Sequence, residues 1–333
     1  MVVKKKVSLL ISMILGATII VGCAQNEGKS NKKVEKISLG ITQIAEHPAL
    51  DSSREGFIKG LESKGYVNGE NLDIDIQNAQ GDIGTSQMIS QNFVSDKKDL
   101  VFAIGTPAAQ ATFNVTKDIP IIVTAVTDAV QAGLVNGIEK SGTNVAGTSD
   151  AVPIEKQFKL LKEIFPEAKK VGILYNTSEI NSEIQIKKAE EIAKEFDLEI
   201  VTSGITTVND MTTALDIILK KVDVLYTLTD NLIASSMPLI STKAIESKIP
   251  VFGAEEAHVK GGALITEGIS YEKLGFEAGL KAVEVIEGKD IKEMTVSSLE
   301  ETELIINTDT LEKIGVQISK DIMDRATKVK GGE

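Results

Sequence analysis

The sequence predicts an α/β fold with two similar lobes, each built around a parallel sheet. Short runs rich in Val, Ile and Leu alternate with amphipathic helical stretches from Lys36 onward. The order and spacing of these runs in 37–125 recur in 170–253, as expected for two lobes of the same topology. The length of 333 residues also favours two domains over one.

The strands expected in both lobes are nearly continuous apolar runs, with little alternation of polar residues. Such runs indicate strands buried on both faces, as in parallel sheets. They are 37–45, 72–78, 100–105 and 120–125 in the first lobe, and 170–175, 198–204, 222–228 and 250–253 in the second. A single larger sheet would accommodate the same strands, so the division into lobes depends on the duplication and on the length.

Helices are expected between these strands, and proline marks where some of them begin. Thr106 followed by Pro107 is typical of an N-cap and a first helical position. Pro153 precedes a stretch in which Phe158 and Leu161 share one face, which indicates a helix packed on a core.

The duplication ends after Gly262, and the remaining elements suggest that the chain crosses between the lobes more than once. We expect a strand at 263–269, a helix at 271–287, a β-rich segment at 294–306 and a helical one at 308–328. Several crossovers would form a hinge rather than a single linker. The expected first lobe is 36–147 with about 264–290, and the second is 148–263 with about 291–330.

The N-terminal segment has the features of an export signal. Lys4–Lys6 is basic, and 7–22 is mostly apolar but too short for a comfortable membrane span. Gly22 directly precedes Cys23, which resembles a bacterial lipoprotein signal. We therefore expect a signal peptide at 1–22, lipidation of Cys23 and a flexible tether at 23–35. An ordinary export signal with an incidental cysteine, or an uncleaved anchor, would show similar features.

Composition argues against several classes of protein. There are 36 Lys and Arg against 48 Asp and Glu, for a formal net charge of -12, which disfavours a nucleic-acid partner. One cysteine excludes an intrachain disulfide, and His47 and His258 are too few for a His-rich metal site. Neither a phosphate loop nor a dinucleotide turn occurs, and Gly147–Ala151 lacks the final glycine of a nucleophile elbow. We expect no enzyme activity, metal or cofactor.

Candidate binding residues follow the strands, because ligands of open parallel sheets bind outside the carboxyl ends of the strands. These segments mix small hydrogen-bonding residues with carboxylates, a combination that suits a zwitterion. Thr106–Ala109 would hold a carboxylate at a helix N-terminus, and Asp150 or Asp230 would hold an ammonium group. The same residues have simpler roles open to them: Asp128 and Asp230 as helix caps, Asp150 in the hinge, and His47 as the start of a helix.

Several of these segments together resemble one family. They are ITQIAEHPALD at 41–51, QNAQGD at 77–82, GTPAAQA at 105–111, TAVTD at 124–128, YNTSEIN at 175–181 and TDN at 229–231. They are similar to the ABC-transporter substrate-binding proteins that include tryptophan- and phenylalanine-binding lipoproteins. The resemblance spans nearly all of 36–288. It implies two Rossmann-like lobes of the type I periplasmic-binding-protein fold, joined by a three-crossover hinge, with delivery of the ligand to a separate permease and ATPase.

The resemblance also implies roles for particular residues. Glu46, His47 and Gln80 would form walls of the first lobe, while Thr106, the amide of Ala108 and Thr127 would hold the carboxylate of an amino acid. The other wall and the ammonium site would come from Asp150, Asn176, Asn181, Asp230, Asn231 and Glu255, and Asp128 and Ser149 lie in the adjoining segments.

The function expected from these features is capture of a small amino acid, aromatic by the family's suggestion (Trp or Phe), by closure of the lobes. We expect a monomeric lipoprotein on the extracytoplasmic face of a bacterial membrane, partnered by an ABC permease and ATPase. A sensory receptor that reports ligand to a signalling partner is the alternative, since both classes use this fold.

Overall fold

The computed structural model describes residues 36–331. The signal peptide, the tether and the lipidation of Cys23 predicted for the N-terminal segment lie outside the described residues. Among the described helices, none is long and apolar enough to cross a membrane.

The first sheet is parallel throughout, with the strand order β11-β5-β4-β3-β1-β2. Ile41 of β1 pairs with Ile76 of β2 on one side and with Phe102 of β3 on the other. The central strands are apolar and fully buried, as the sequence predicts. The strands are β1 (Ile37–Gln43), β2 (Leu72–Asn78), β3 (Leu100–Ile104), β4 (Ile121–Thr124), β5 (Val145–Ser149) and β11 (Val296–Ser298).

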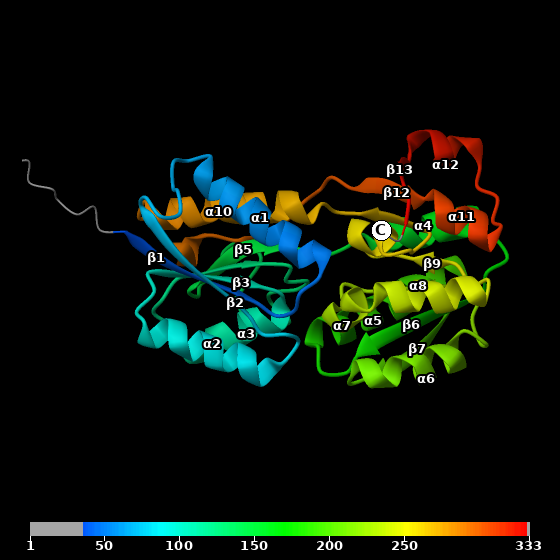
Figure 1. The fold of residues 1–333 in the computed structure, drawn as a ribbon, viewed down its shortest axis with the longest axis horizontal. Coiled ribbons are helices and arrows are strands. Elements are labelled where there is room, and N and C mark those ends of the chain that lie inside the picture. The colour runs from blue at the N-terminus through cyan, green and yellow to red at the C-terminus, as the bar shows by residue number, and fades with distance from the viewer. Residues whose placement is uncertain (1–35, 332–333) are drawn as a thin grey trace, which may run out of the picture. The chain divides into compact units, whose positions relative to one another are not determined.

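Helices cover both faces of this sheet. Helices α1 (Pro48–Glu62) and α10 (Tyr271–Ile286) lie side by side on one face, and α2 (Ile83–Ser95) and α3 (Thr106–Val115) on the other (Figure 1). Burial of the apolar face of each helix drives this packing. The rings of Phe57 from α1 and Phe102 from β3 stack at the centre of the first core.

The second sheet has the order β13-β12-β10-β9-β8-β6-β7. Its neighbouring strands are parallel except for the antiparallel pair of β10 and β12. The strands are β6 (Lys170–Asn176), β7 (Glu199–Ile205), β8 (Val224–Tyr226), β9 (Val251–Phe252), β10 (Ile265–Gly268), β12 (Glu303–Asn307) and β13 (Thr327–Val329). Helices α4 (Ile154–Ile164) and α5 (Ile180–Ala193) contribute to one core, and α6 (Val208–Ile218) and α8 (Met237–Glu246) to another. Short helices complete the lobe: α7 (Asn231–Ser235), α9 (Glu256–Lys260), α11 (Thr308–Ile314) and α12 (Lys320–Arg325).

Within residues 36–331 the chain passes between the sheets three times: from β5 to α4, from β10 to α10 and from β11 to β12. The first two crossovers are short, and the third is the segment 299–302. The prediction of two lobes with parallel sheets and a three-crossover hinge is confirmed.

The predicted lobe boundaries need correction. Ile265 of β10 pairs with Phe252 and with Ile306, so the second crossover follows β10 instead of preceding it. Val296 of β11 pairs with Gly147, so the third crossover also lies later than predicted. The strand after Gly262 and the β-rich segment are short stretches that would fit either sheet, and backbone hydrogen bonding to an available edge decides between them.

Helix α10 is held to the first lobe by an unusually close crossing with α1. Gly56 and Gly60 of α1 face Gly275 and Gly279 of α10, and a Cβ atom on any of them would overlap backbone of the opposite helix. At Gly275 the clashing atom is the carbonyl oxygen of Ser53. This contact fixes the helix that follows the second crossover, so it sets where the hinge begins in the first lobe.

Candidate ligand-binding site

Two adjoining cavities lie where the carboxyl ends of the two sheets meet. The outer cavity has a volume of about 490 Å³. It is lined by 44–46, 80–84 and Pro107 of the first lobe, and by Asn176, Ser178, Glu179, Thr206, Val208, Asn231, Leu232 and Ser235 of the second. The inner chamber measures about 10 Å³, room for one water-sized group. Its lining is His47, Ala49, Leu50, Ala125, Asp150, Thr229, Asp230, Asn231, Ala234, Glu255, His258 and Tyr271.

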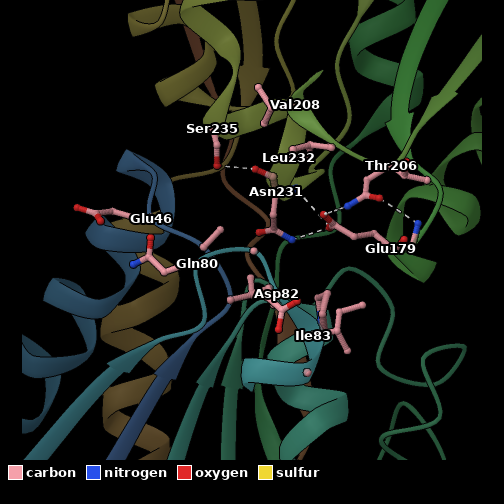
Figure 2. Close-up of a pocket in the computed structure, with 17 residues that line it drawn as sticks. Glu46, Gln80, Asp82, Ile83, Glu179, Thr206, Val208, Asn231, Leu232 and Ser235 are labelled. Atoms are coloured by element: carbon pink, nitrogen blue, oxygen red, sulfur yellow. Dashed lines mark hydrogen bonds between the residues drawn. The ribbon is translucent and has the colours of Figure 1, made fainter. Parts of the chain in front are cut away.

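Asn231 lines both cavities and stands between the lobes (Figure 2). Its side-chain amide donates to Glu179 Oε2 at 2.6 Å, and its backbone N–H donates to the same oxygen at 3.2 Å. The amide groups of Asn176 and Asn181 also donate to Glu179, at 3.2 and 3.0 Å. The Glu179 carboxyl therefore holds together the second-lobe wall of the site.

Two hydrogen bonds join the lobes directly at this site. His47 Nε2 at the start of α1 lies 3.4 Å from Asn231 Oδ1. The hydroxyls of Thr127 and Thr229 lie 3.1 Å apart. Because these pairs come from opposite lobes, they link the two walls of the site.

Asp150, in the first crossover, connects the hinge to the contact between Thr127 and Thr229. Its Oδ1 accepts a hydrogen bond from the Thr127 hydroxyl at 3.0 Å, and its Oδ2 accepts one from the Tyr271 hydroxyl at 2.7 Å. Tyr271 opens α10 directly after the second crossover. Two of the three crossovers are thus bonded through one buried carboxyl.

Asp230 stabilises the second-lobe wall of the site through the hydrogen bonds that its carboxyl accepts. Its carboxyl caps α7 by accepting from the backbone N–H of Ile233 at 3.0 Å, and it also accepts from Asn176 N at 2.6 Å and the Ser182 hydroxyl at 2.7 Å. Of the two roles open to Asp230 in the sequence, the helix cap is present.

Burial perturbs the carboxyl groups strongly. Burial raises the pKa of Glu255 to about 8, and burial together with the nearby Asp230 charge raises the pKa of Glu179 to about 7. The pKa values of Asp150 and Asp230 are also raised by burial, against the hydrogen bonds that they accept. Of the described residues that line the two cavities, none is Lys or Arg, so the charges of these carboxylates have no cationic partner in the lining.

The two histidines have the opposite shift. Burial lowers the pKa of His47 to about 4 and that of His258 to about 3, so both rings are neutral near pH 7. Among residues 36–331, no group of three or more His, Cys, Asp or Glu side chains is arranged to hold a metal ion.

Most of the residues chosen from the sequence lie at this site. The outer cavity is lined by Glu46, Gln80, Asn176 and Asn231, and the inner chamber by His47, Asp150, Asp230, Asn231 and Glu255. Thr127 and Asn181 bond to Thr229, through its hydroxyl and its carbonyl oxygen respectively, and the Ser149 hydroxyl donates to the Thr127 carbonyl.

Three of the chosen residues lie differently from the expectation. Thr106 and Ala108 are buried in the first turn of α3 and line neither cavity, although Pro107 between them does. The N-cap of α3 is Gly105, with a φ of 94° that favours glycine, and not Thr106. Asp128 accepts from the backbone N–H groups of Val130 and Gln131 as a local cap and lines neither cavity.

Four residues of the site were missed by reasoning from the sequence: Glu179, Thr229, His258 and Tyr271. Glu179 and Thr229 belong to segments singled out after their strands, and their neighbours were chosen in their place. His258 is one of two histidines in the chain, a signal that the sequence does carry. The sequence carries no such signal for Tyr271, because the role of this residue depends on the position of the second crossover.

Two α/β lobes, three crossovers and a polar cavity between the carboxyl ends of the sheets define a solute-binding protein of the type I periplasmic-binding-protein fold. The chain belongs to the ABC transporter substrate binding protein family, which it matches over residues 38–330. Members of this family bind small molecules outside the cytoplasm and work with an ABC permease and ATPase; they are not enzymes.

Three relatives are informative. A tyrosine-binding protein of Clostridioides difficile (strain R20291) is 51% identical over 321 residues, covering 94% of this chain and 93% of the relative. A structure from Streptococcus pneumonia in complex with L-Trp has a TM-score of 0.85 at 32% identity, covering 89% of this chain and 100% of that one. The ligand-free, open structure of a substrate-binding protein with adhesive properties from Clostridium difficile has a TM-score of 0.68 at 49% identity. The match covers 89% of this chain and 99% of that one.

Proposed function

We propose that the chain captures an aromatic amino acid between its lobes and presents it to an ABC permease for import. The observation that carries this proposal is the buried carboxyl of Glu179 in the wall of the outer cavity, whose described lining holds no Lys or Arg. Burying carboxylates without a partner costs several kcal/mol each. An ammonium group on the ligand offsets this cost.

The amino-acid carboxylate has a complementary place at the start of α3. The Thr106 hydroxyl is buried and has no hydrogen-bond partner among residues 36–331. The N-terminus of a helix favours an anion through its free N–H groups and its dipole. Pro107 brings this turn to the wall of the outer cavity, so Thr106 and the amide of Ala108 remain the proposed carboxylate site.

An aromatic side chain is supported by the relatives and by the lining. The relative at 51% identity is a tyrosine-binding protein, and a structural relative holds L-Trp. The outer cavity carries Ile44, Pro107, Val208 and Leu232, and apolar walls of this kind can flank a ring.

Ligand capture proceeds by closure of the lobes, in which the ligand stabilises the form with the most contacts to it. The comparison of TM-scores supports two arrangements in this family. The open, ligand-free relative is the more similar in sequence, at 49% identity, yet its TM-score of 0.68 is lower than the 0.85 of the L-Trp complex at 32% identity. The present structure therefore corresponds better to a closed arrangement.

Calorimetry tests this function directly. The full chain, freed of co-purified molecules, is titrated with L-tryptophan, L-tyrosine and L-phenylalanine, with D-glucose as the control. We expect micromolar or tighter binding of at least one aromatic amino acid, with a melting temperature that rises with ligand concentration. Absence of binding to all three amino acids would rule out the proposed ligand class.

We also propose that the protein is monomeric and held on the extracytoplasmic face of the cell membrane by a lipid on Cys23. Replacement by serine, Cys23→Ser, removes the thiol that would carry the lipid, so the protein is expected in the soluble fraction of cells instead of the membrane fraction. Continued incorporation of labelled fatty acid into the variant would contradict the anchor.

A further inference from the structure

Three buried polar atoms in the inner chamber lack a hydrogen-bond partner among residues 36–331: His47 Nδ1, Glu255 Oε1 and His258 Nε2. Their residues are only 7%, 2% and 1% exposed. A buried polar atom that has no hydrogen-bond partner is destabilising. Three such atoms around one small chamber point to a ligand group that satisfies them.

The hydrogen-bond partners of His258 identify which of its nitrogens carries the proton. Its Nδ1 accepts from the backbone N–H of Ala254 at 3.2 Å and lies 2.9 Å from the Thr227 hydroxyl. A nitrogen that accepts an N–H bond is unprotonated, so the proton of the neutral ring is on Nε2. His258 therefore offers the chamber a free donor.

His47 offers the opposite. Its Nε2 lies 3.4 Å from Asn231 Oδ1, and that oxygen is identified because the other end of the Asn231 amide donates to Glu179. The proton of the neutral His47 ring is thus on Nε2, facing an acceptor, and Nδ1 has a free lone pair. Glu255 uses its Oε2 to accept from the Ala257 N–H at 2.5 Å, while Oε1 lies 3.4 Å from His258 Nε2 without forming a hydrogen bond.

A hydroxyl group fits this set better than other polar groups. It accepts from the His258 N–H and donates to His47 Nδ1 or to Glu255 Oε1. An ammonium group cannot accept from His258, a carboxylate cannot donate to His47 Nδ1, and a hydrocarbon satisfies none of the three. The volume of about 10 Å³ suits the tip of a ligand rather than its whole body.

We infer that His47, Glu255 and His258 form a subsite that reads the phenolic hydroxyl of the ligand, so that the protein prefers tyrosine over phenylalanine. The inference rests on the proposed function and deepens it. Asn231 lines both cavities, which allows a ligand whose head lies in the outer cavity to place its tip in the chamber. Ala49, Leu50 and Ala234 supply apolar walls beside the three polar atoms.

The test is the ratio of dissociation constants for L-phenylalanine and L-tyrosine, measured by calorimetry on the full chain. A site built to bond a hydroxyl leaves its own groups unpaired when the hydroxyl is missing, so we expect a ratio of at least about tenfold in favour of tyrosine. O-Methyl-L-tyrosine, which cannot donate and is larger, is expected to bind more weakly than tyrosine.

Two variants locate the effect. His258→Asn keeps an acceptor near the Ala254 N–H and removes the Nε2 donor. His47→Leu removes the Nδ1 acceptor, and the His47 side chain caps no N–H group of α1 that would be lost with it. Both are expected to move the ratio toward one. Glu256→Gln is the control: Glu256 is on the same short helix but pairs with Lys260 and lines neither cavity, so its ratio is expected to match the wild type. Melting curves verify that each variant is folded. A shift of the ratio toward one in either histidine variant supports the subsite by itself.

Equal affinities for the two amino acids in the wild-type protein would overturn the inference while leaving aromatic amino-acid binding intact, and the chamber would then serve an ordered water. A ratio that stays at its wild-type value in both histidine variants would overturn it as well. If none of the aromatic amino acids binds, the proposed function itself fails and the inference fails with it.

Discussion

The hydroxyl of Thr127 in the first lobe lies 3.1 Å from the hydroxyl of Thr229 in the second. Thr127 gives its single proton to Asp150 at 3.0 Å, so Thr229 must be the donor between the two threonines. The resulting chain, from Thr229 through Thr127 to Asp150, runs from one lobe to the hinge. This series of hydrogen bonds therefore links the contact between the lobes to the crossover segment, and its disruption should alter ligand affinity.

Thr127→Val should weaken binding of the aromatic ligand. The substitution keeps the shape of the side chain but leaves Asp150 with one donor fewer and Thr229 without its partner in the closed form. We expect a loss of about 1–3 kcal/mol in binding free energy, measured by calorimetry. Thr213→Val, at an exposed position of α6, is the control. An affinity equal to that of the control would show that the threonine pair contributes nothing to closure.

Tyr271→Phe removes the second donor to Asp150. Because this carboxyl is buried, the loss raises the cost of the closed form, and the pKa of Asp150 should rise further above its ordinary value. We expect ligand affinity to fall by about 1–3 kcal/mol in free energy, measured by calorimetry. An affinity equal to that of the wild-type protein would contradict this account.

The stability of the ligand-free protein should depend on pH. The pKa values of Glu179 and Glu255 are raised from 4.5 to about 7 and about 8, so the folded protein binds more protons than the unfolded chain in that interval. The free energy of unfolding therefore falls as pH rises through it. His47 and His258, with pKa values lowered from 6.5 to about 4 and about 3, act in the opposite direction, but only below 6.5.

The two effects separate as pH rises above 6.5, where the contribution of the histidines fades while Glu179 and Glu255 still titrate. Between pH 6.5 and 8 we expect the ligand-free protein to lose roughly 2 kcal/mol of stability, measured by denaturant unfolding at constant salt. Glu255→Gln should reduce this slope, whereas the exposed substitution Glu272→Gln should leave it as it is. A slope that is flat or rising would contradict burial of these carboxyls in the ligand-free protein.

The ammonium group of the ligand should be essential for binding. N-Acetyl-L-tyrosine retains the ring, the hydroxyl and the carboxylate but has no positive charge to offset the buried Glu179 carboxyl in the outer cavity. Charge-assisted hydrogen bonds contribute about 1.5–3 kcal/mol each, so we expect its affinity to be at least about tenfold weaker than that of L-tyrosine. Comparable affinities by competition calorimetry would mean that Glu179 does not face the amino group.

Gly275→Ala should destabilise the first lobe. Its Cβ would overlap the carbonyl oxygen of Ser53 in α1, which forces the two helices apart. Overpacking of this kind costs about 1–3 kcal/mol. Glu277→Ala, on the exposed side of the same helix, is the control for changed helix propensity. A melting temperature equal to that of the control would show that α1 and α10 can separate without cost.

The sequence predicted the fold well because its signals are local and repeated. Buried parallel strands are continuous apolar runs, such as Val101–Ile104, and this pattern predicts a strand wherever the strand lies in the sheet. The assignment of β10 and β11 was wrong for a different reason. Each is a short strand that either sheet could have accepted, and long-range backbone pairing with Phe252 or Gly147 decided which one did.

The candidate site was predicted in part. His47, Asp150, Asp230 and Glu255 were chosen because they follow strands, and they do line one chamber. Asp128 also follows a strand but turns to cap its own loop, a difference of side-chain direction that no spacing rule records.

Sequence by itself determined the two-lobe α/β class, the family and the strand ends at which a ligand would bind, because hydrophobic patterning and short motifs are properties of neighbouring residues. Tertiary structure decided where the chain crosses between lobes, that Tyr271 bonds Asp150 across two crossovers, and which buried atoms of His47, Glu255 and His258 remain free. The physical reason is that burial and hydrogen-bond satisfaction depend on residues far apart in the chain, whose meeting is settled only when both sheets and the hinge are formed.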